Sequence, residues 1–143
     1  MALNRKIITN SYEETQATAI KFAKTLKADD VILMFGDLGA GKTCFTNGIL
    51  YGLDFLEGGS SPTFTIVNEY PTTPKINHFD LYRLQSEDEL FDMGFADYFD
   101  KGNISIVEWP QIAGEFLEKR KTITVKINFT ENDGEREITI ERH

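Results

Sequence analysis

The chain has 143 residues, of which 41% are hydrophobic, and its formal net charge is −8 at pH 7. This length suits one domain with a sizeable core, and no apolar run approaches the roughly eighteen residues of a membrane span. The N-terminus lacks the apolar segment of a signal peptide, and the single cysteine excludes a disulfide framework. We therefore expect a cytoplasmic protein without a membrane partner. Its acidic surface should not bind nucleic acid unaided.

The first predicted elements are a strand and a helix. Residues Lys6 to Thr9 include two isoleucines and a threonine, which is typical of a short strand. Ser11 followed by Glu14 fits a capping box that begins a helix running to about Lys27. The expected apolar face of that helix consists of Ala17, Ile20, Phe22, Ala23 and Leu26.

A glycine-rich segment follows the next apolar run. Gly36, Gly41, Lys42 and Thr43 match the G-x-x-x-x-G-K-[ST] spacing of a phosphate-binding loop. Val31 to Phe35 predicts a buried strand and Thr43 to Leu53 a helix, which is the order that this motif requires. Glycines let backbone N–H groups face a phosphate, and the helix N-terminus adds a partial positive charge.

In such a loop the lysine reaches the β and γ phosphates of a nucleotide and the threonine hydroxyl holds Mg²⁺. The alternative is a glycine turn between a strand and a helix with an incidental lysine. A dinucleotide fingerprint is excluded, because Gly36, Gly39 and Gly41 are spaced G-x-x-G-x-G. Cys44 follows the loop and is interpreted as a small core residue.

The middle of the chain predicts a hairpin and a short helix. Thr63 to Tyr70 and Lys75 to Tyr82 have strand character and are separated by a turn with two prolines. Ser86 with Glu89 fits a second capping box, opening a helix to Met93, and Phe95 to Phe99 adds a turn. Phe91, Phe95, Tyr98 and Phe99 suit either the core, which is favoured, or a docking patch.

The last third predicts a buried strand, a helix and a second hairpin. Ile104 to Trp109 is apolar except at its end, and Pro110 to Lys119 is compatible with a helix. Thr122 to Phe129 and Glu137 to Ile140 alternate apolar and polar residues around a turn at Asn132-Asp133-Gly134. Residues 1–143 therefore predict one α/β domain whose mixed sheet has a parallel core and antiparallel hairpins.

Two carboxylates follow apolar strand residues, Asp80 and Glu108. Ligands of open α/β sheets bind at the carboxyl ends of the strands, so both are candidates to serve Mg²⁺ or water, against the alternative of ordinary helix capping. The hydroxyls near Ser61-Pro62-Thr63 suit either a nucleotide-sensing segment or an ordinary turn. Trp109 suits either a position over the site or packing in the core. His78 is interpreted as a packed residue, because no second histidine has metal-ligand spacing.

Four motifs in order resemble those of the bacterial TsaE family, formerly called YjeE. They are Gly36-Asp37-Leu38-Gly39-Ala40-Gly41-Lys42-Thr43, Ser61-Pro62-Thr63-Phe64-Thr65, His78-Phe79-Asp80-Leu81-Tyr82-Arg83-Leu84 and Glu108-Trp109-Pro110. The resemblance runs from about Ile8 to the final hairpin and implies a P-loop NTPase-like, three-layer fold.

The resemblance also implies an activity and partners. Members of the family are ATPases that act with TsaD and TsaB in making N6-threonylcarbamoyladenosine in tRNA, so the chain would contact tRNA only through those partners. It implies that ATP and Mg²⁺ are the cofactors, with Lys42, Asp80 and Glu108 catalytic, Thr43 and Glu108 serving the metal, and Ser61-Pro62-Thr63 forming a switch loop. The expected nucleotide-binding residues are Gly36, Asp37, Leu38, Gly39, Ala40, Gly41, Lys42, Thr43 and Cys44, with Ser11 and Asn132 near the adenine.

Two other functions use the same loop. A small-molecule or nucleoside kinase would need an acceptor pocket and usually an arginine-bearing lid, but the five arginines are scattered along the chain. A nucleotide-dependent binding module would show negligible turnover. A GTPase is disfavoured, because the chain has no Asn-Lys-x-Asp segment to read guanine.

Overall fold

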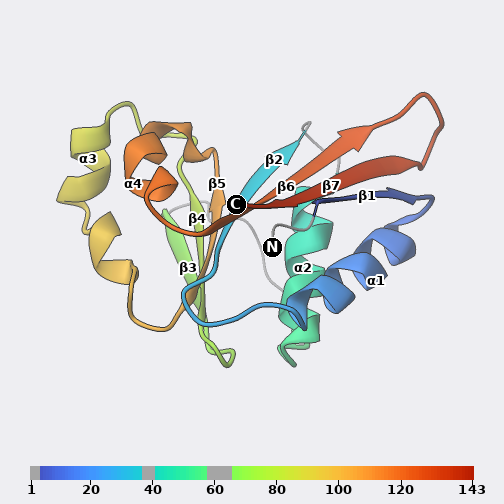
Figure 1. Ribbon diagram of the computed structural model, residues 1–143, viewed down its shortest axis with the longest axis horizontal. Coiled ribbons are helices and arrows are strands. Elements are labelled where there is room, and N and C mark those ends of the chain that lie inside the picture. Colours follow the sequence, from blue (N-terminus) through green and yellow to red (C-terminus); the bar gives the residue numbers. More distant parts are fainter. Residues whose placement is uncertain (1–3, 37–40, 58–65) are drawn as a thin grey trace.

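A computed structural model describes residues 4–36, 41–57 and 66–143. Its centre is one seven-stranded sheet in the order β1-β7-β6-β2-β5-β4-β3 (Figure 1). The strands are β1 (Asn4–Thr9), β2 (Val31–Gly36), β3 (Val67–Tyr70), β4 (Ile76–Asp80), β5 (Ile104–Glu108), β6 (Thr122–Phe129) and β7 (Arg136–Arg142).

The four central strands of the sheet are parallel. Strand β2 pairs in parallel with β5 and with β6, and β5 pairs in parallel with β4. The outer strands are antiparallel, because β3 and β4 form one hairpin, β6 and β7 form another, and β1 pairs with β7. The carboxyl ends of β2, β4 and β5 therefore meet at one edge, where ligands of such sheets bind.

Helices α1 (Tyr12–Ala23) and α2 (Lys42–Gly52) lie together on one side of the sheet, and the shorter helices lie on the other (Figure 1). The shorter ones are α3 (Glu87–Asp92), the 3₁₀ turn η1 (Phe95–Tyr98), the 3₁₀ turn η2 (Pro110–Ala113) and α4 (Gly114–Glu118). Both predicted serine caps are formed: the Ser11 hydroxyl accepts from the backbone N–H of Glu14, and the Ser86 hydroxyl accepts from that of Glu89. The two glutamate carboxylates accept from the N–H one residue before each serine, at Asn10 and Gln85.

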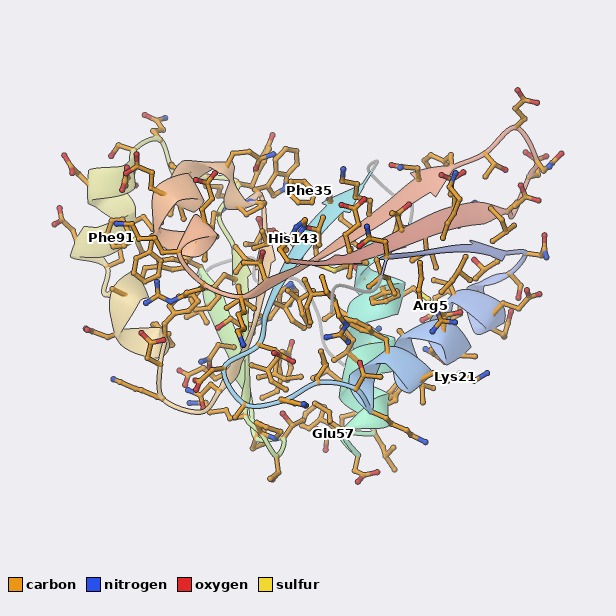
Figure 2. All side chains as sticks on the ribbon, viewed as in Figure 1. Arg5, Lys21, Phe35, Glu57, Phe91 and His143 are labelled. Atoms are coloured by element: carbon orange, nitrogen blue, oxygen red, sulfur yellow. The ribbon has the colours of Figure 1, made fainter. Side chains whose placement is uncertain are left out.

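Two hydrophobic clusters fill the spaces between the layers, as the packed side chains in Figure 2 show. Alternate residues of β2 enter different clusters. Ile32 and Met34 pack with α1 and α2, whereas Val31 packs with residues of α3 and α4. The sheet is thus covered on both faces in its centre, which gives three layers and confirms the expected α/β fold with a parallel core and antiparallel hairpins.

Helices α1 and α2 approach closely through small residues. A Cβ atom built on Gly48 of α2 would lie 2.4 Å from the Cβ of Ala19, and one on Gly52 would lie 2.6 Å from that of Ala23. These pairs repeat every four residues on both helices, so the contact runs along one face of each. This packing fixes the position of the start of α2 above the sheet.

Several boundaries differ from the sequence-based expectation. The buried face of α1 includes Thr15 and Ala19, whereas Ala17 is exposed. Strand β4 ends at Asp80, because the Asp80 carboxylate accepts from the backbone N–H of Tyr82 and forms a local turn. The expected helix over residues 110–119 is divided at Ala113, whose φ of −106° is not helical. None of the described helices has the length and apolar character needed to cross a bilayer.

Candidate functional site

A cavity of about 550 Å³ opens at the carboxyl ends of the parallel strands, beside the start of α2. Its volume is within the range of small-molecule sites, about 300–1,000 Å³. It is lined by Ser11, Tyr12, Thr15, Gly36, Gly41, Lys42, Thr43, Cys44, Asp80, Glu108, Trp109, Gly134 and Arg136. Residues from α1, α2, three parallel strands and the last hairpin therefore meet at one place.

Two glycines at the ends of the loop are required by geometry. Gly36 ends β2, and a Cβ atom there would lie 2.3 Å from the backbone oxygen of Ile127 on β6. Gly41 precedes α2 with φ +119°, a conformation that side chains disfavour. Its carbonyl accepts from the N–H of Phe45, so the helix begins at once, and residues Lys42, Thr43 and Cys44 of its first turn line the cavity.

Lys42 and Glu108 come together on the floor of this cavity. The Lys42 Nζ atom lies 3.9 Å from Glu108 Oε1, and the two side chains are only 13% and 7% exposed. The other carboxylate oxygen, Oε2, lies 2.7 Å from Nε2 of His78 on β4. A cation and a carboxylate held this far from solvent interact more strongly than an exposed pair. The arrangement places one positive and one negative group where a phosphate and its metal would lie.

Trp109 holds a backbone conformation that is unusual for its residue type. Its φ and ψ of 57° and 55° are left-handed, directly before Pro110. The ring centroid lies 5.2 Å from Lys42 Nζ and 5.1 Å from the ring of Tyr82. Both residues are exposed, Trp109 by 44% and Tyr82 by 66%, and Trp109 lines the cavity. The strained turn thus presents an aromatic face to the lysine and to solvent together.

Asp80 and Glu108 occupy paired positions on the neighbouring strands β4 and β5. Burial raises the pKa of the Asp80 carboxyl above its ordinary value, the backbone N–H of Tyr82 opposes this, and the charge of Glu108 adds to the rise. Two shielded carboxylates side by side repel one another, and a divalent cation between them would relieve that repulsion. Lys42 and His78 offset part of the rise in the pKa of Asp80, and a bound cation would relieve the repulsion that these two groups leave.

The donors available at the cavity fit Mg²⁺ better than a metal with an all-protein cage. Within residues 4–36, 41–57 and 66–143, no three His, Cys, Asp or Glu side chains gather as a metal-ligand group. Magnesium commonly takes one or two carboxylates and completes its shell with phosphate oxygens and water. Glu108, Asp80 and the Thr43 hydroxyl line the same cavity and supply such a partial set of oxygen ligands.

The outer end of the cavity is formed by the beginning of α1 and by the β6–β7 hairpin. Ser11, Tyr12 and Thr15 contribute from the first segment, and Gly134 and Arg136 from the second. The Arg136 guanidinium lies 4.5 Å from the ring centroid of Phe129. Asn132 is absent from the described lining, and its amide donates instead to the carboxylate of Glu135 within the hairpin.

The remaining expected site residues divide into two sets. Cys44 is buried as expected and also lines the cavity, where burial raises the pKa of its thiol and an interaction with the Tyr12 side chain opposes that rise. The other set lies outside the described residues and comprises Asp37, Leu38, Gly39, Ala40, Ser61, Pro62 and Thr63.

Sequence reasoning missed part of this arrangement. It did not select Thr15, Gly134 or Arg136, and it treated His78 as packing alone. His78 had a signal available, because it precedes Asp80 by two residues and therefore points to the same face of its strand. Arg136 had none, since its place at the cavity depends on the pairing of β7 with β1 and β6.

Comparisons with known proteins identify the family of this chain. The family model described as Threonylcarbamoyl adenosine biosynthesis protein TsaE matches residues 9–138. A Bacillus subtilis (strain 168) protein named tRNA threonylcarbamoyladenosine biosynthesis protein TsaE is 42% identical over 129 residues, which cover 89% of this chain and 78% of the relative. A protein of the same name from Treponema pallidum (strain Nichols) is 32% identical over 136 residues, or 94% of this chain and 98% of the relative.

A solved structure shares the fold. The crystal structure of YdiB from Bacillus subtilis matches with a TM-score of 0.79 and 34% identity, covering 99% of this chain and 87% of that one. The family match extends over most of the sequence, and the relatives match along nearly their whole length or most of it. The chain therefore belongs to the TsaE family of threonylcarbamoyl adenosine biosynthesis proteins.

Proposed function

We propose that this chain binds ATP with Mg²⁺ in the cavity at the start of α2 and hydrolyses it as an accessory subunit in tRNA threonylcarbamoyladenosine biosynthesis. The observation that carries the proposal is the meeting of Lys42 with Glu108, 3.9 Å apart, in a cavity that begins at a glycine-preceded helix. A helix N-terminus, a lysine and a shielded carboxylate are what a magnesium nucleotide requires.

Each residue has a separate task in this proposal. Lys42 and the N–H groups at the start of α2 bind the phosphates, and Thr43 and Glu108 serve Mg²⁺, which neutralises charge on the phosphate oxygens. Asp80 lies beside Glu108 and orients the attacking water. Ser11 and the hairpin residues Gly134 and Arg136 line the end of the cavity where the base would lie. The loop residues 37–40 and 61–63 complete the phosphate and switch functions.

The partners proposed are TsaD and TsaB. The net charge of −8 supports a division of labour in which those partners, and not this chain, hold the tRNA. Trp109 lines the cavity, is exposed and packs against exposed Tyr82, so a partner is able to touch a residue that also contacts Lys42. We further propose that residues 1–143 act as one domain, which the single sheet supports, and that they act in the cytoplasm.

The test is phosphate release from ATP by the wild type, Lys42→Ala and Glu108→Ala, each with and without TsaD and TsaB. We expect slow release by the wild type alone, faster release with the partners, and a loss of roughly 100-fold or more in both variants. Lys126→Ala is the matched control, because Lys126 is an exposed lysine of β6 outside the described cavity lining. It should release phosphate at the wild-type rate.

Other outcomes identify the competing functions. Transfer of the γ-phosphate to a small metabolite would make the chain a kinase. Nucleotide binding without phosphate release under any condition would make it a binding module. Equal rates of phosphate release by the wild type and Lys42→Ala would show that the cavity takes no part in hydrolysis.

A further inference from the structure

His78 is buried against the proposed site without belonging to the described cavity lining. Its residue exposure is 1%, and its Nε2 atom lies 2.7 Å from Glu108 Oε2. The two side chains come from adjacent parallel strands, since His78 pairs with Ile106 and Glu108 with Asp80. The contact is therefore set by the register of β4 and β5, not by a mobile loop.

The polarity of this hydrogen bond follows from its surroundings. Glu108 Oε1 lies 3.9 Å from Nζ of Lys42, so the carboxylate faces a cation on that side. A carboxylate only accepts hydrogen bonds, so Nε2 of His78 carries the proton and donates. The other ring nitrogen, Nδ1, is buried and has no hydrogen-bond partner among the described residues.

An unpartnered buried nitrogen is unfavourable for the fold, and an aliphatic side chain at this position would avoid it. The neighbouring cluster on this face of the sheet is made largely of aliphatic and aromatic side chains. Packing therefore gives no reason for an imidazole at residue 78. The hydrogen bond to Glu108 gives a reason for the imidazole.

We propose that His78 is a positioning residue that locks the Glu108 carboxylate for metal binding. By holding Oε2 it stops the carboxylate from rotating, and it leaves Oε1 directed toward Lys42 and the cavity. Residues that bond to a metal ligand from behind fix its orientation in this way, and their loss typically weakens metal binding about 10- to 100-fold. This inference rests on the proposed function, because it concerns the same magnesium nucleotide.

The test measures binding without turnover. The dissociation constant of ADP is determined by calorimetry in excess Mg²⁺ and again in EDTA. The constant in EDTA divided by the constant in Mg²⁺ reports the contribution of the metal. In His78→Leu the ratio should fall toward one, a loss of about 10- to 100-fold in metal affinity, while the constant in EDTA stays at the wild-type value. His78→Gln should restore the ratio, because its amide nitrogen donates from a similar reach.

Asn77→Leu is the matched control for burial. Asn77 is 0% exposed on the same strand, points to the opposite face, and its side-chain amide also has no partner among the described residues. It should keep the wild-type ratio. Equal losses in His78→Leu and Asn77→Leu, or failure of His78→Gln to restore the ratio, would overturn the role of His78.

The failure of the inference and the failure of the proposed function are distinguishable. A large ratio in the wild type that is unchanged in His78→Leu overturns the positioning role alone and leaves the nucleotide site standing. A ratio of one in the wild type, or no binding of ADP at all, overturns both.

Discussion

Asp80 carries a carboxyl group whose environment disfavours its charge. Burial raises its pKa above the ordinary value, and the charge of Glu108 adds to that rise. The folded state therefore holds a proton on Asp80 at pH values where the unfolded chain has lost it. Between the ordinary and the raised pKa, stability falls as the pH rises, and above the raised pKa the full penalty is present.

Replacing Asp80 by Asn should therefore stabilise the unliganded fold at neutral pH. The amide oxygen still accepts from the backbone N–H of Tyr82, so the local turn is kept. Thermal unfolding followed at pH 7.5 and again below the ordinary Asp pKa of about 3.9 checks this. The advantage of Asp80→Asn should be present at pH 7.5 and vanish at the acid end.

Asp133→Asn serves as the control, because Asp133 lies exposed in the last hairpin turn. Its melting temperature should match the wild type at neutral pH. An Asp80→Asn variant that melts below the wild type at pH 7.5 would contradict the electrostatic account of this residue.

At the scale of elements, the approach of α1 to α2 leaves no room for a methyl group. In Gly48→Ala the new Cβ would lie 2.4 Å from the Cβ of Ala19 and 2.8 Å from the backbone oxygen of Gln16. Alanine favours a helix over glycine by about 1 kcal/mol, but overpacking against backbone costs about 1–3 kcal/mol. Because two contacts of the new Cβ would be shorter than 3 Å, the upper part of this range applies, and urea unfolding should show a net loss of about 1–2 kcal/mol.

Gly114→Ala provides the comparison for this prediction. Gly114 begins α4, and no atom lies within 4 Å of a Cβ built there. Its stability should stay within about 0.5 kcal/mol of the wild type or rise slightly. If Gly48→Ala unfolded at the same urea concentration as Gly114→Ala, the two helices would not be packed as described.

The elements themselves were predictable from local chemistry, whereas their order in the sheet was not. Ser11 and Ser86 predicted two helix starts, because a capping hydroxyl and its N–H partner lie within one turn. By contrast, the place of β2 between β5 and β6 depends on pairings across about seventy or more residues. No short-range pattern encodes such a register.

The site shows the same division between local and long-range information. Lys42 and Thr43 belong to a contiguous motif, and Glu108 ends an apolar strand, so sequence alone selected them. Gly134 and Arg136 line the cavity only because the last hairpin folds beside α1, and His78 matters through a contact 30 residues away in the chain. The roles of these three residues depend on contacts that only the folded chain makes.

At the scale of the whole molecule, a ligand that ties these segments together should stabilise all of them. Magnesium and ADP at about 100 times the dissociation constant add about 2.7 kcal/mol to the free energy of unfolding. For a chain of this size that corresponds to a rise in melting temperature of about 5–11 °C. Lys42→Ala should show little or no rise in melting temperature. A wild-type melting temperature that stays unchanged up to millimolar ADP would contradict the nucleotide site.

The pairing of β1 with β7 has a consequence for synthesis. A ribosome releases residues 4–9 early, but their neighbour in the sheet, residues 136–142, emerges more than a hundred residues later. At typical elongation rates of about 5–20 residues per second, the nascent N-terminal segment waits roughly 6–26 seconds without its hydrogen-bonding neighbour. The cavity at the start of α2 therefore gains its last wall only after the final hairpin has left the exit tunnel.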